Sequence, residues 1–83
     1  MASSGVGGWT YDAAMRVAIC EEGGANVLGS TYSGYFGMLN STWLAYGGAE
    51  FASNAYYATW DQQIIVAARI QTNPPDQNGC AAW

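Results

Sequence analysis

The sequence predicts a small, mainly α-helical domain of about three helices, with a minimal β-hairpin or loop region and one disulfide. Two stretches, residues 11–22 and 60–71, repeat apolar side chains at helical spacing, and glycine-rich stretches with turn signals separate the helical segments. With 83 residues the chain is expected to form one domain, and its core is small enough to benefit from a covalent cross-link.

Residues 1–8 are expected to be a flexible lead-in, so that the domain proper covers residues 9–83. The lead-in lacks the charged start and the apolar stretch of a signal peptide. No apolar run elsewhere approaches the roughly 20 residues that a membrane-spanning helix needs. We therefore expect no membrane partner.

The first helix is expected to run from about Tyr11 to Glu22, with Thr10 as its N-cap and Gly23-Gly24 at its end. Met15 and Ile19 fall beside its main apolar face, so the helix is apolar over a wide arc and is expected to be largely buried. The main face is formed by Ala14, Val17, Ala18 and Glu21.

The stretch that follows the first helix is rich in Gly, Ser, Tyr and Asn. It predicts a loop with one short hairpin, with turn signals at Gly29-Ser30 and Ser33-Gly34. A short helix should follow, capped by Asn40 or Ser41 and ending at Gly47-Gly48.

Residues 49–58 are expected to be a partly helical connection to the last helix, which carries the clearest signals. Thr59-Trp60-Asp61-Gln62 matches a capping box, in which the Thr and Gln side chains satisfy opposite backbone donors. Asn73-Pro74-Pro75 should end this helix. Its apolar face is predicted to contain Trp60, Ile64, Ala67, Ala68 and Gln71, with Ile65 and Val66 beside it.

Charged side chains are sparse: 2 basic and 6 acidic residues and no histidine give a net charge of −4. Two cations cannot neutralise a run of phosphates, which excludes nucleic acid as a partner. Without histidine, His-based metal sites and His-dependent catalytic triads cannot form, and we expect no metal and no cofactor. Aromatic residues make up 14% of the chain, which suits a groove for a neutral, ring-shaped ligand, although small domains also use aromatic residues as core.

Cys20 and Cys80 lie near opposite ends of the chain. A bond between them would enclose about sixty residues and contribute roughly 4 kcal/mol through the lost entropy of the unfolded chain. It would also favour an extracellular, cell-wall or virion-exposed location. The alternative is two buried free thiols.

Glu21 is the main catalytic candidate on physical grounds, because it lies in the last turn of a mostly apolar helix. The partial negative charge of the helix C-terminus and burial both disfavour the carboxylate form. Both effects therefore favour a protonated acid of the kind that glycosidic cleavage requires. The alternative is a solvated glutamate at a helix end.

The stretch Cys20-Glu21-Glu22-Gly23-Gly24 resembles the Cys-Glu-Ser-Gly-Gly motif of resuscitation-promoting factors. These are actinobacterial peptidoglycan-cleaving enzymes with a small lysozyme-like fold. The resemblance spans about residues 14–80, and several weak matches in order make it fairly specific. The further matching segments are Tyr32-Ser33-Gly34, Ser41-Thr42-Trp43, Ala45-Tyr46-Gly47-Gly48, Ala58-Thr59, Gln63-Ile64 and Cys80.

The resemblance implies a lysozyme-like fold with Glu21 as the catalytic glutamate and a disulfide between Cys20 and Cys80. The alternatives are a helix cap for Thr42, a half-core position for Trp43 and a structural role for Gln63. The substrate-contacting positions implied by the family, together with the weaker candidate Tyr46, are Tyr32, Thr42, Trp43, Tyr46 and Gln63.

The chain departs from the family pattern at several points. Ala14 stands where the family has a tryptophan, a space that Trp9 would fill from upstream. Gly37 stands where the family tends to carry glutamine, and the loop after Gly24 is shorter. These departures put the sugar subsites in question more than the acid, and they suggest a distant branch, such as a phage-encoded or tail-associated lytic domain.

The expected substrate is the glycan strand of peptidoglycan, cleaved between N-acetylmuramic acid and N-acetylglucosamine at the cell wall. Most glycosidases pair the acid with a second carboxylate. The five candidates for it are Asp12, Glu22, Glu50, Asp61 and Asp76, of which Glu50 is the one left open. Without a convincing partner, lytic transglycosylase chemistry is favoured over hydrolysis.

Three other interpretations stay open at this point. The first is a wall-binding module that keeps the groove but has no turnover. The second is a structural segment of a virion tail, or more generally a part of a larger secreted or phage protein. The third is a disulfide-stapled helical domain that binds no sugar.

Overall fold

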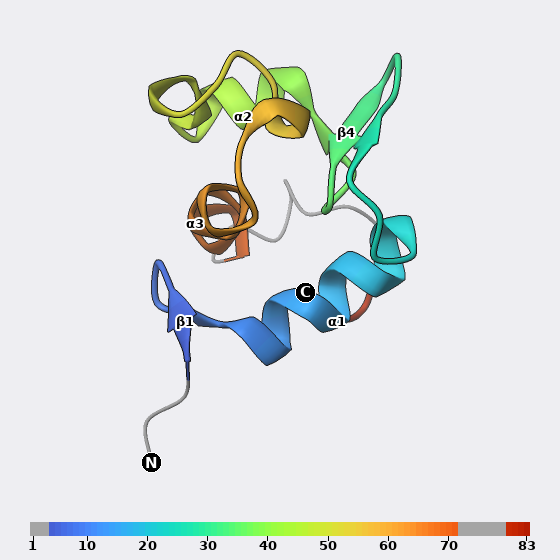
Figure 1. The fold of residues 1–83 in the computed structure, drawn as a ribbon, viewed down its shortest axis with the longest axis vertical. Helices are drawn as coiled ribbons and strands as arrows, with labels where there is room; N and C mark the ends of the chain where they lie inside the picture. Colours follow the sequence, from blue (N-terminus) through green and yellow to red (C-terminus); the bar gives the residue numbers. More distant parts are fainter. Residues whose placement is uncertain (1–3, 72–79) are drawn as a thin grey trace.

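The computed structural model describes residues 4–71 and 80–83. Within these residues, the fold is built around three helices that enclose one apolar core (Figure 1). No helix in this part of the chain is long and apolar enough to cross a membrane. The helices are α1 (Tyr11–Glu22), α2 (Asn40–Ala45) and α3 (Trp60–Gln71), with two 3₁₀ turns, η1 (Gly48–Glu50) and η2 (Ala55–Tyr57).

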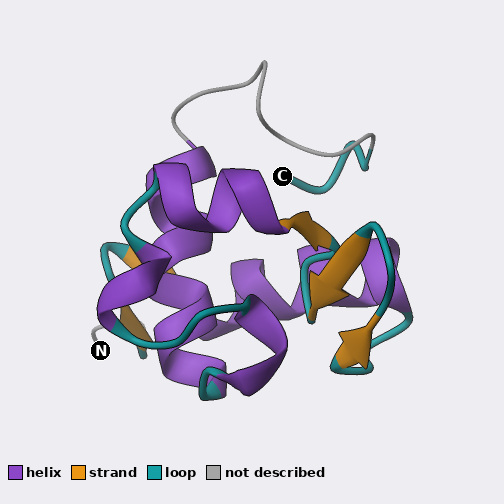
Figure 2. Ribbon diagram, turned by 90° about the horizontal axis from the view of Figure 1, so that it is seen from above, coloured by secondary structure: helices purple, strands orange, loops and turns teal. Residues whose placement is uncertain are grey.

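Short strands form two small antiparallel sheets, which lie on opposite sides of the helices (Figure 2). The mainly α-helical class and the disulfide are therefore confirmed, and the connection over residues 49–58 is partly helical as expected. The first sheet pairs β1 (Gly5–Val6) with β2 (Trp9–Thr10), and the second pairs β3 (Val27–Leu28), β4 (Tyr32–Gly34) and β5 (Met38–Leu39) in that order.

Of the segment expected to be a flexible lead-in, residues 5–8 form a hairpin with β2, and residues 1–3 lie outside the described residues. Val6 pairs with Trp9 in the register, and both side chains pack against the core. Gly7 and Gly8 form the turn with φ values of 63° and 83°, which glycine adopts without steric cost. A Gly-Gly pair between two apolar residues is a hairpin signal, and the sequence analysis overlooked it.

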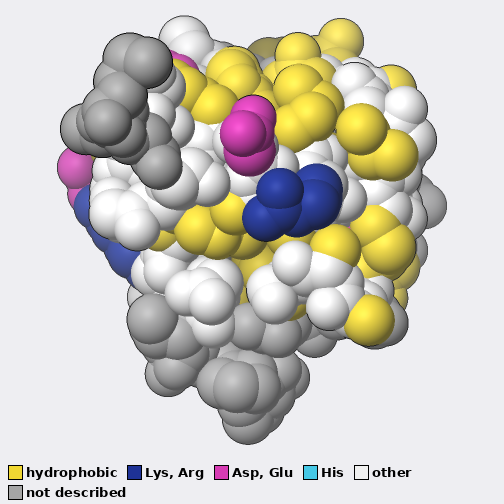
Figure 3. All heavy atoms as spheres, turned by 90° about the horizontal axis from the view of Figure 1, so that it is seen from below, with side chains coloured by type: hydrophobic (Ala, Val, Ile, Leu, Met, Phe, Trp, Pro, Cys, Tyr) yellow, Lys and Arg dark blue, Asp and Glu magenta, His cyan; other side chains and the backbone are white. Residues whose placement is uncertain are grey.

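Helix α1 has the predicted bounds and the predicted ends. The Thr10 hydroxyl accepts a hydrogen bond from the Ala13 N–H at 3.1 Å, as an N-cap does. Gly23 and Gly24 end the helix in left-handed conformations. Burial is narrower than expected, because Met15 and Ile19 are 44% and 57% exposed. Figure 3 shows the molecule from below, on the α1 side. Hydrophobic and uncharged polar side chains make up most of this face, and few of its side chains are charged.

The second sheet confirms the predicted hairpin but moves one of its turns. Gly29-Ser30 lies in the β3–β4 turn, where the Gly29 N–H donates to the Tyr32 carbonyl at 3.1 Å. Ser33-Gly34 was expected to be a turn but lies in β4, and the chain reverses after it, over residues 35–37. Gly34 is required here because a Cβ atom would come within 2.5 Å of the Gln63 Oε1 atom.

Helix α2 begins at Asn40, and neither predicted cap is used, because its N-cap is Leu39 without a side-chain hydrogen bond. Its Trp43 is fully buried and donates from Nε1 to the Ala52 carbonyl at 2.8 Å. Gly48 lies directly against the indole, where a Cβ atom would come within 2.2 Å of the ring. Trp43 is therefore the centre of the core on this side of the molecule.

Helix α3 begins with the predicted capping box. The Thr59 N–H donates to Gln62 Oε1 at 3.0 Å, and the Gln62 N–H donates to Thr59 Oγ1 at 3.2 Å. The helix is described as far as Gln71, so the predicted stop at residues 73–75 lies outside the described residues. Its fully buried side chains are Gln63, Ile64, Val66, Ala67 and Ile70.

Candidate active site

Glu21 is the second-last residue of α1, and its side chain is half-buried. Its Oε2 atom accepts a hydrogen bond of 2.6 Å from the indole Nε1 of Trp83. Helix α1 ends at Glu22, and from there the chain runs on to the β3–β5 sheet (Figure 1), so Glu21 stands at the helix end that leads to this sheet. The structure therefore places a partly exposed carboxylate, held by a tryptophan N–H, at the C-terminal end of α1.

The disulfide between Cys20 and Cys80 explains how Trp83 reaches this position. The bond is present, as predicted, with a Cα–Cα distance of 6.1 Å. Cys20 directly precedes Glu21, so the bond fixes the segment of residues 80–83 beside the C-terminal turn of α1. Trp83 follows three residues after the anchored Cys80, which is close enough for its ring to reach the carboxylate.

The indole of Trp83 is also held by other aromatic rings. It stacks on Trp9 of β2, with centroids 5.7 Å apart and planes at 13°, and lies 6.0 Å from Phe36. Phe36 is 1% exposed and stacks in turn on Trp60 of α3 at 5.6 Å. We call Trp9, Phe36, Trp60 and Trp83 the aromatic cluster. The sequence analysis missed Trp83, although its position close to Cys80 was an available signal.

Glu22, one of the five carboxylates considered as a partner for Glu21, is half-buried directly beside it in the sequence. Burial raises the pKa of Glu22, and the negative charge of Glu21 raises it further. Adjacent helical residues point about 100° apart, so the two carboxylates interact through their charges without facing the same point in space. The Glu21 charge therefore acts on Glu22 from a neighbouring face of the helix.

The other described carboxylates have partners or lie far from Glu21. Glu50 of η1 forms an ion pair with Arg69 of α3 at 3.4 Å. Asp61 accepts a hydrogen bond of 2.9 Å from the Tyr11 hydroxyl, and this bond is the main cause that raises the pKa of Tyr11, followed by burial and the Asp61 charge. Asp12 is exposed in the first turn of α1.

Two of the five predicted substrate-contacting residues have their side chains inside the protein. Trp43 and Gln63 are both 0% exposed. The Gln63 amide accepts from the Tyr35 N–H at 2.8 Å and donates to Asn26 Oδ1 and the Ala58 carbonyl, each at 3.1 Å. Both side chains therefore hold the fold around the site, and their contact with substrate stays a prediction.

The other three predicted residues retain accessible surface. Tyr32 of β4 is 46% exposed and pairs with Leu39 across the sheet. Thr42 and Tyr46 are half-buried on and after α2, where the Tyr46 N–H donates to the Thr42 carbonyl at 3.1 Å. Contact of Tyr32, Thr42 and Tyr46 with substrate stays a prediction.

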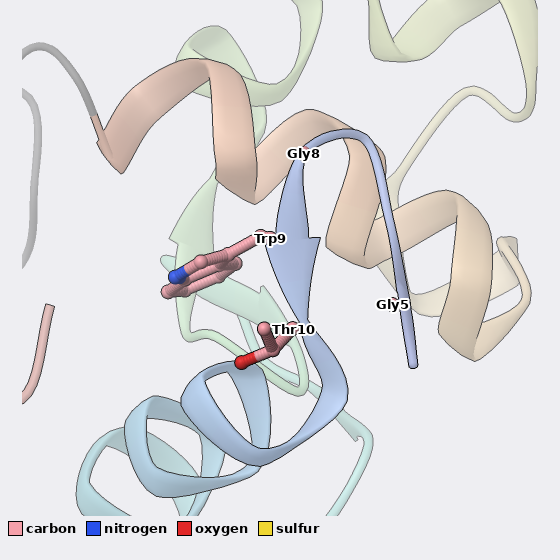
Figure 4. A pocket seen from close by; sticks show the side chains of 4 residues that line it. All are labelled: Gly5, Gly8, Trp9 and Thr10. Atoms are coloured by element: carbon pink, nitrogen blue, oxygen red, sulfur yellow. The ribbon is translucent and has the colours of Figure 1, made fainter. Parts of the chain in front are cut away.

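An open hollow of about 280 Å³ lies beside the first hairpin (Figure 4). Its described lining is Gly5, Gly8, Trp9 and Thr10, and the side chains of Trp9 and Thr10 point to the same side of β2. Trp9 belongs to the aromatic cluster, so this hollow adjoins the rings that hold Trp83. In the described residues, no group of three or more Asp, Glu, Cys or His side chains is arranged to hold a metal ion.

A mainly helical domain with a small three-stranded sheet, and a glutamate at the end of its first long helix, has the architecture of a small lysozyme-like domain. Comparison with known proteins identifies the group more narrowly. The chain belongs to the transglycosylase-like domain family, whose model matches residues 8–83.

Curated relatives of this chain include several resuscitation-promoting factors. Rpf1 of Corynebacterium glutamicum is 49% identical over 71 residues, which cover 82% of this chain and 34% of that protein. RpfA of Mycobacterium tuberculosis is 44% identical over 71 residues, covering 82% of this chain and 16% of that protein. Rpf2 of Corynebacterium glutamicum is 39% identical over 70 residues. The chain thus spans about a third of the length of Rpf1 and less than a fifth of the other two, and the family resemblance seen in the sequence is confirmed.

Proposed function

We propose that this domain cleaves the glycan strands of bacterial peptidoglycan between N-acetylmuramic acid and N-acetylglucosamine, with Glu21 as the general acid. The observation that supports this most directly is the position of Glu21 at the end of α1, half-buried and held by the Trp83 N–H at 2.6 Å. Membership of the transglycosylase-like domain family supports the same reaction class. The disulfide suits an extracellular or cell-wall location.

The chemistry is proposed to be that of a lytic transglycosylase. Protonated Glu21 donates its proton to the glycosidic oxygen, and the bond between that oxygen and C1 of N-acetylmuramic acid breaks. The 6-hydroxyl of the same sugar then forms a bond to C1 and returns its proton to the Glu21 carboxylate. The products are a free 4-hydroxyl on one fragment and a 1,6-anhydro end on the other, and no water is consumed.

The positions of Asp12, Asp61 and Glu50 support this mechanism over hydrolysis. Two-carboxylate glycosidases separate their pair by about 5–5.5 Å when retaining and about 6.5–9.5 Å when inverting. Asp12 lies nine residues before Glu21 on the same helix, about 13 Å away along its axis. Asp61 is bonded to Tyr11 at the opposite end of that helix.

Glu50 is also poorly placed for such a pair. It is engaged by Arg69, and the α2–η1 region that carries it lies at the opposite side of the view from α1 in Figure 1. Asp76 lies outside the described residues. An internal hydroxyl of the substrate therefore takes the place of a water activated by a second carboxylate.

The test is digestion of purified actinobacterial peptidoglycan with the wild-type chain and with Glu21→Gln, followed by mass spectrometry of the soluble fragments. Glu22→Gln is the matched control, because it makes the same chemical change at the next residue. We expect anhydro-ended fragments from the wild type and from Glu22→Gln, and none from Glu21→Gln. Circular dichroism spectra should show that all three chains are folded.

Other outcomes would reject the proposal in different ways. Fragments with ordinary reducing ends would mean hydrolysis and would require a second carboxylate, for which Glu50→Gln and Asp76→Asn are the next variants. Equal release by the wild type and Glu21→Gln would remove Glu21 from the mechanism. Wall binding by both chains without release would indicate a binding module in place of an enzyme.

A further inference from the structure

We propose that Trp83 is a positioning residue for Glu21: its indole N–H holds Oε2, so that Oε1 is the oxygen presented to the glycosidic bond. This inference rests on the proposed function. It starts from a hydrogen bond of 2.6 Å between side chains that are 62 residues apart in the sequence. An indole N–H can only donate, so Trp83 must be the donor and the Glu21 carboxyl oxygen the acceptor.

The donor is held in place before any substrate arrives. Trp83 stacks on Trp9 at 5.7 Å and lies 6.0 Å from Phe36, while the disulfide fixes the chain three residues earlier, at Cys80. A glutamate near a helix end otherwise has several rotamers available. A fixed donor on one carboxyl oxygen restricts that choice, and positioned groups of this kind lower barriers because no reorganisation is needed during the reaction.

The decisive variant is Trp83→Phe in the full chain, which keeps an aromatic ring but removes the N–H. Trp60→Phe is the matched control, because Trp60 also stacks on Phe36 in the aromatic cluster and no contact of it with Glu21 is found among the described residues. We expect Trp83→Phe to lower kcat by about 10- to 100-fold with little change in KM, the size expected when a catalytic group is misplaced. Trp60→Phe should keep kcat within about twofold of the wild type.

A second measurement does not depend on turnover. The indole N–H resonances of the tryptophans are recorded by ¹H–¹⁵N correlation NMR, and the peak missing in Trp83→Phe belongs to Trp83. This peak should shift in Glu21→Gln, while the Trp60 indole peak stays in place. If Trp83→Phe fails to fold, benzothienylalanine at position 83 replaces it, because this residue keeps the ring shape and has sulfur where the N–H was.

Each result supports or overturns the role of Trp83. An unchanged kcat in a folded Trp83→Phe chain overturns it, and so does a higher kcat, which would mean that Trp83 occludes the site. A rise in KM alone would make Trp83 a substrate contact. If the Trp83 indole peak does not shift in Glu21→Gln, the hydrogen bond between Trp83 and Glu21 is not formed, and the proposal is overturned. If the wild type releases no fragments although that peak does shift, the proposed function is wrong. The positioning role is then wrong as well, whereas the hydrogen bond between Trp83 and Glu21 is still supported.

Discussion

Replacement of Gln63 by methionine removes three hydrogen bonds from the protein interior while nearly preserving side-chain length. The Gln63 amide links three separate segments: the turn after β4 through the Tyr35 N–H, the loop after α1 through Asn26, and the segment before α3 through the Ala58 carbonyl. Gln63 has no exposed surface, so water from outside cannot replace the hydrogen bonds that the methionine variant loses.

The magnitude follows from the number of bonds. Each hydrogen bond contributes about 1 kcal/mol net, so Gln63→Met should lower the free energy of unfolding by about 3 kcal/mol. For a domain of this size, that corresponds to a fall in Tm of roughly 12–24 °C. The assay is thermal and urea unfolding followed by circular dichroism. Gln62→Met is the matched control, because it loses one capping bond at an exposed helix end and should cost about 1 kcal/mol or less.

A loss smaller than about 1 kcal/mol in Gln63→Met would refute this reasoning, because the three partners would then have found other acceptors and donors. A stable Gln63→Met chain with weakened binding of glycan fragments would restore the direct substrate contact that the family resemblance implied. The measurement therefore separates a structural role from a binding role at one residue.

Three further predictions concern other parts of the molecule. Gly48→Ala places a methyl group within 2.2 Å of the Trp43 ring, so it should lower the free energy of unfolding in urea by about 1–3 kcal/mol, the usual cost of overpacking. Burial and the Glu21 charge raise the pKa of Glu22 above 4.5, so stability present below pH 4.5 is lost as the pH rises through the folded-state pKa. Glu22→Gln should therefore raise the Tm at pH 7 and leave it unchanged near pH 3, measured by differential scanning calorimetry. Reduction of the disulfide, whose cysteines are 60 residues apart, should lower the urea midpoint by the equivalent of about 4 kcal/mol.

Contrary results would be informative in each case. An unchanged urea midpoint in Gly48→Ala would mean that the Trp43 ring moves freely in the core. An equal Tm change at both pH values in Glu22→Gln would point to packing as the cause, since charge acts only where Glu22 is ionised. A reduced chain that stays as stable as the oxidised one would mean that packing of residues 80–83 holds them without the bond.

Much of the architecture was accessible from the sequence because the responsible signals are local. Thr10 and Gly23-Gly24 bound α1, and the Thr59–Gln62 capping box starts α3, where the sequence predicted. The failures were local as well. The Gly7-Gly8 turn was overlooked, and Ser33-Gly34 was taken for a turn because glycine marks both turns and close contacts.

For the candidate site, the sequence by itself determined the residue types: a glutamate after a cysteine, a late second cysteine, and no histidine to support other chemistry. Only the tertiary structure decided that Trp83 donates to Glu21 and that the Gln63 amide faces inward. Residue spacing specifies which side chains share a helix face, because a helix repeats every 3.6 residues. It carries no such rule for side chains 62 residues apart, whose contact depends on how the disulfide and the aromatic cluster pack.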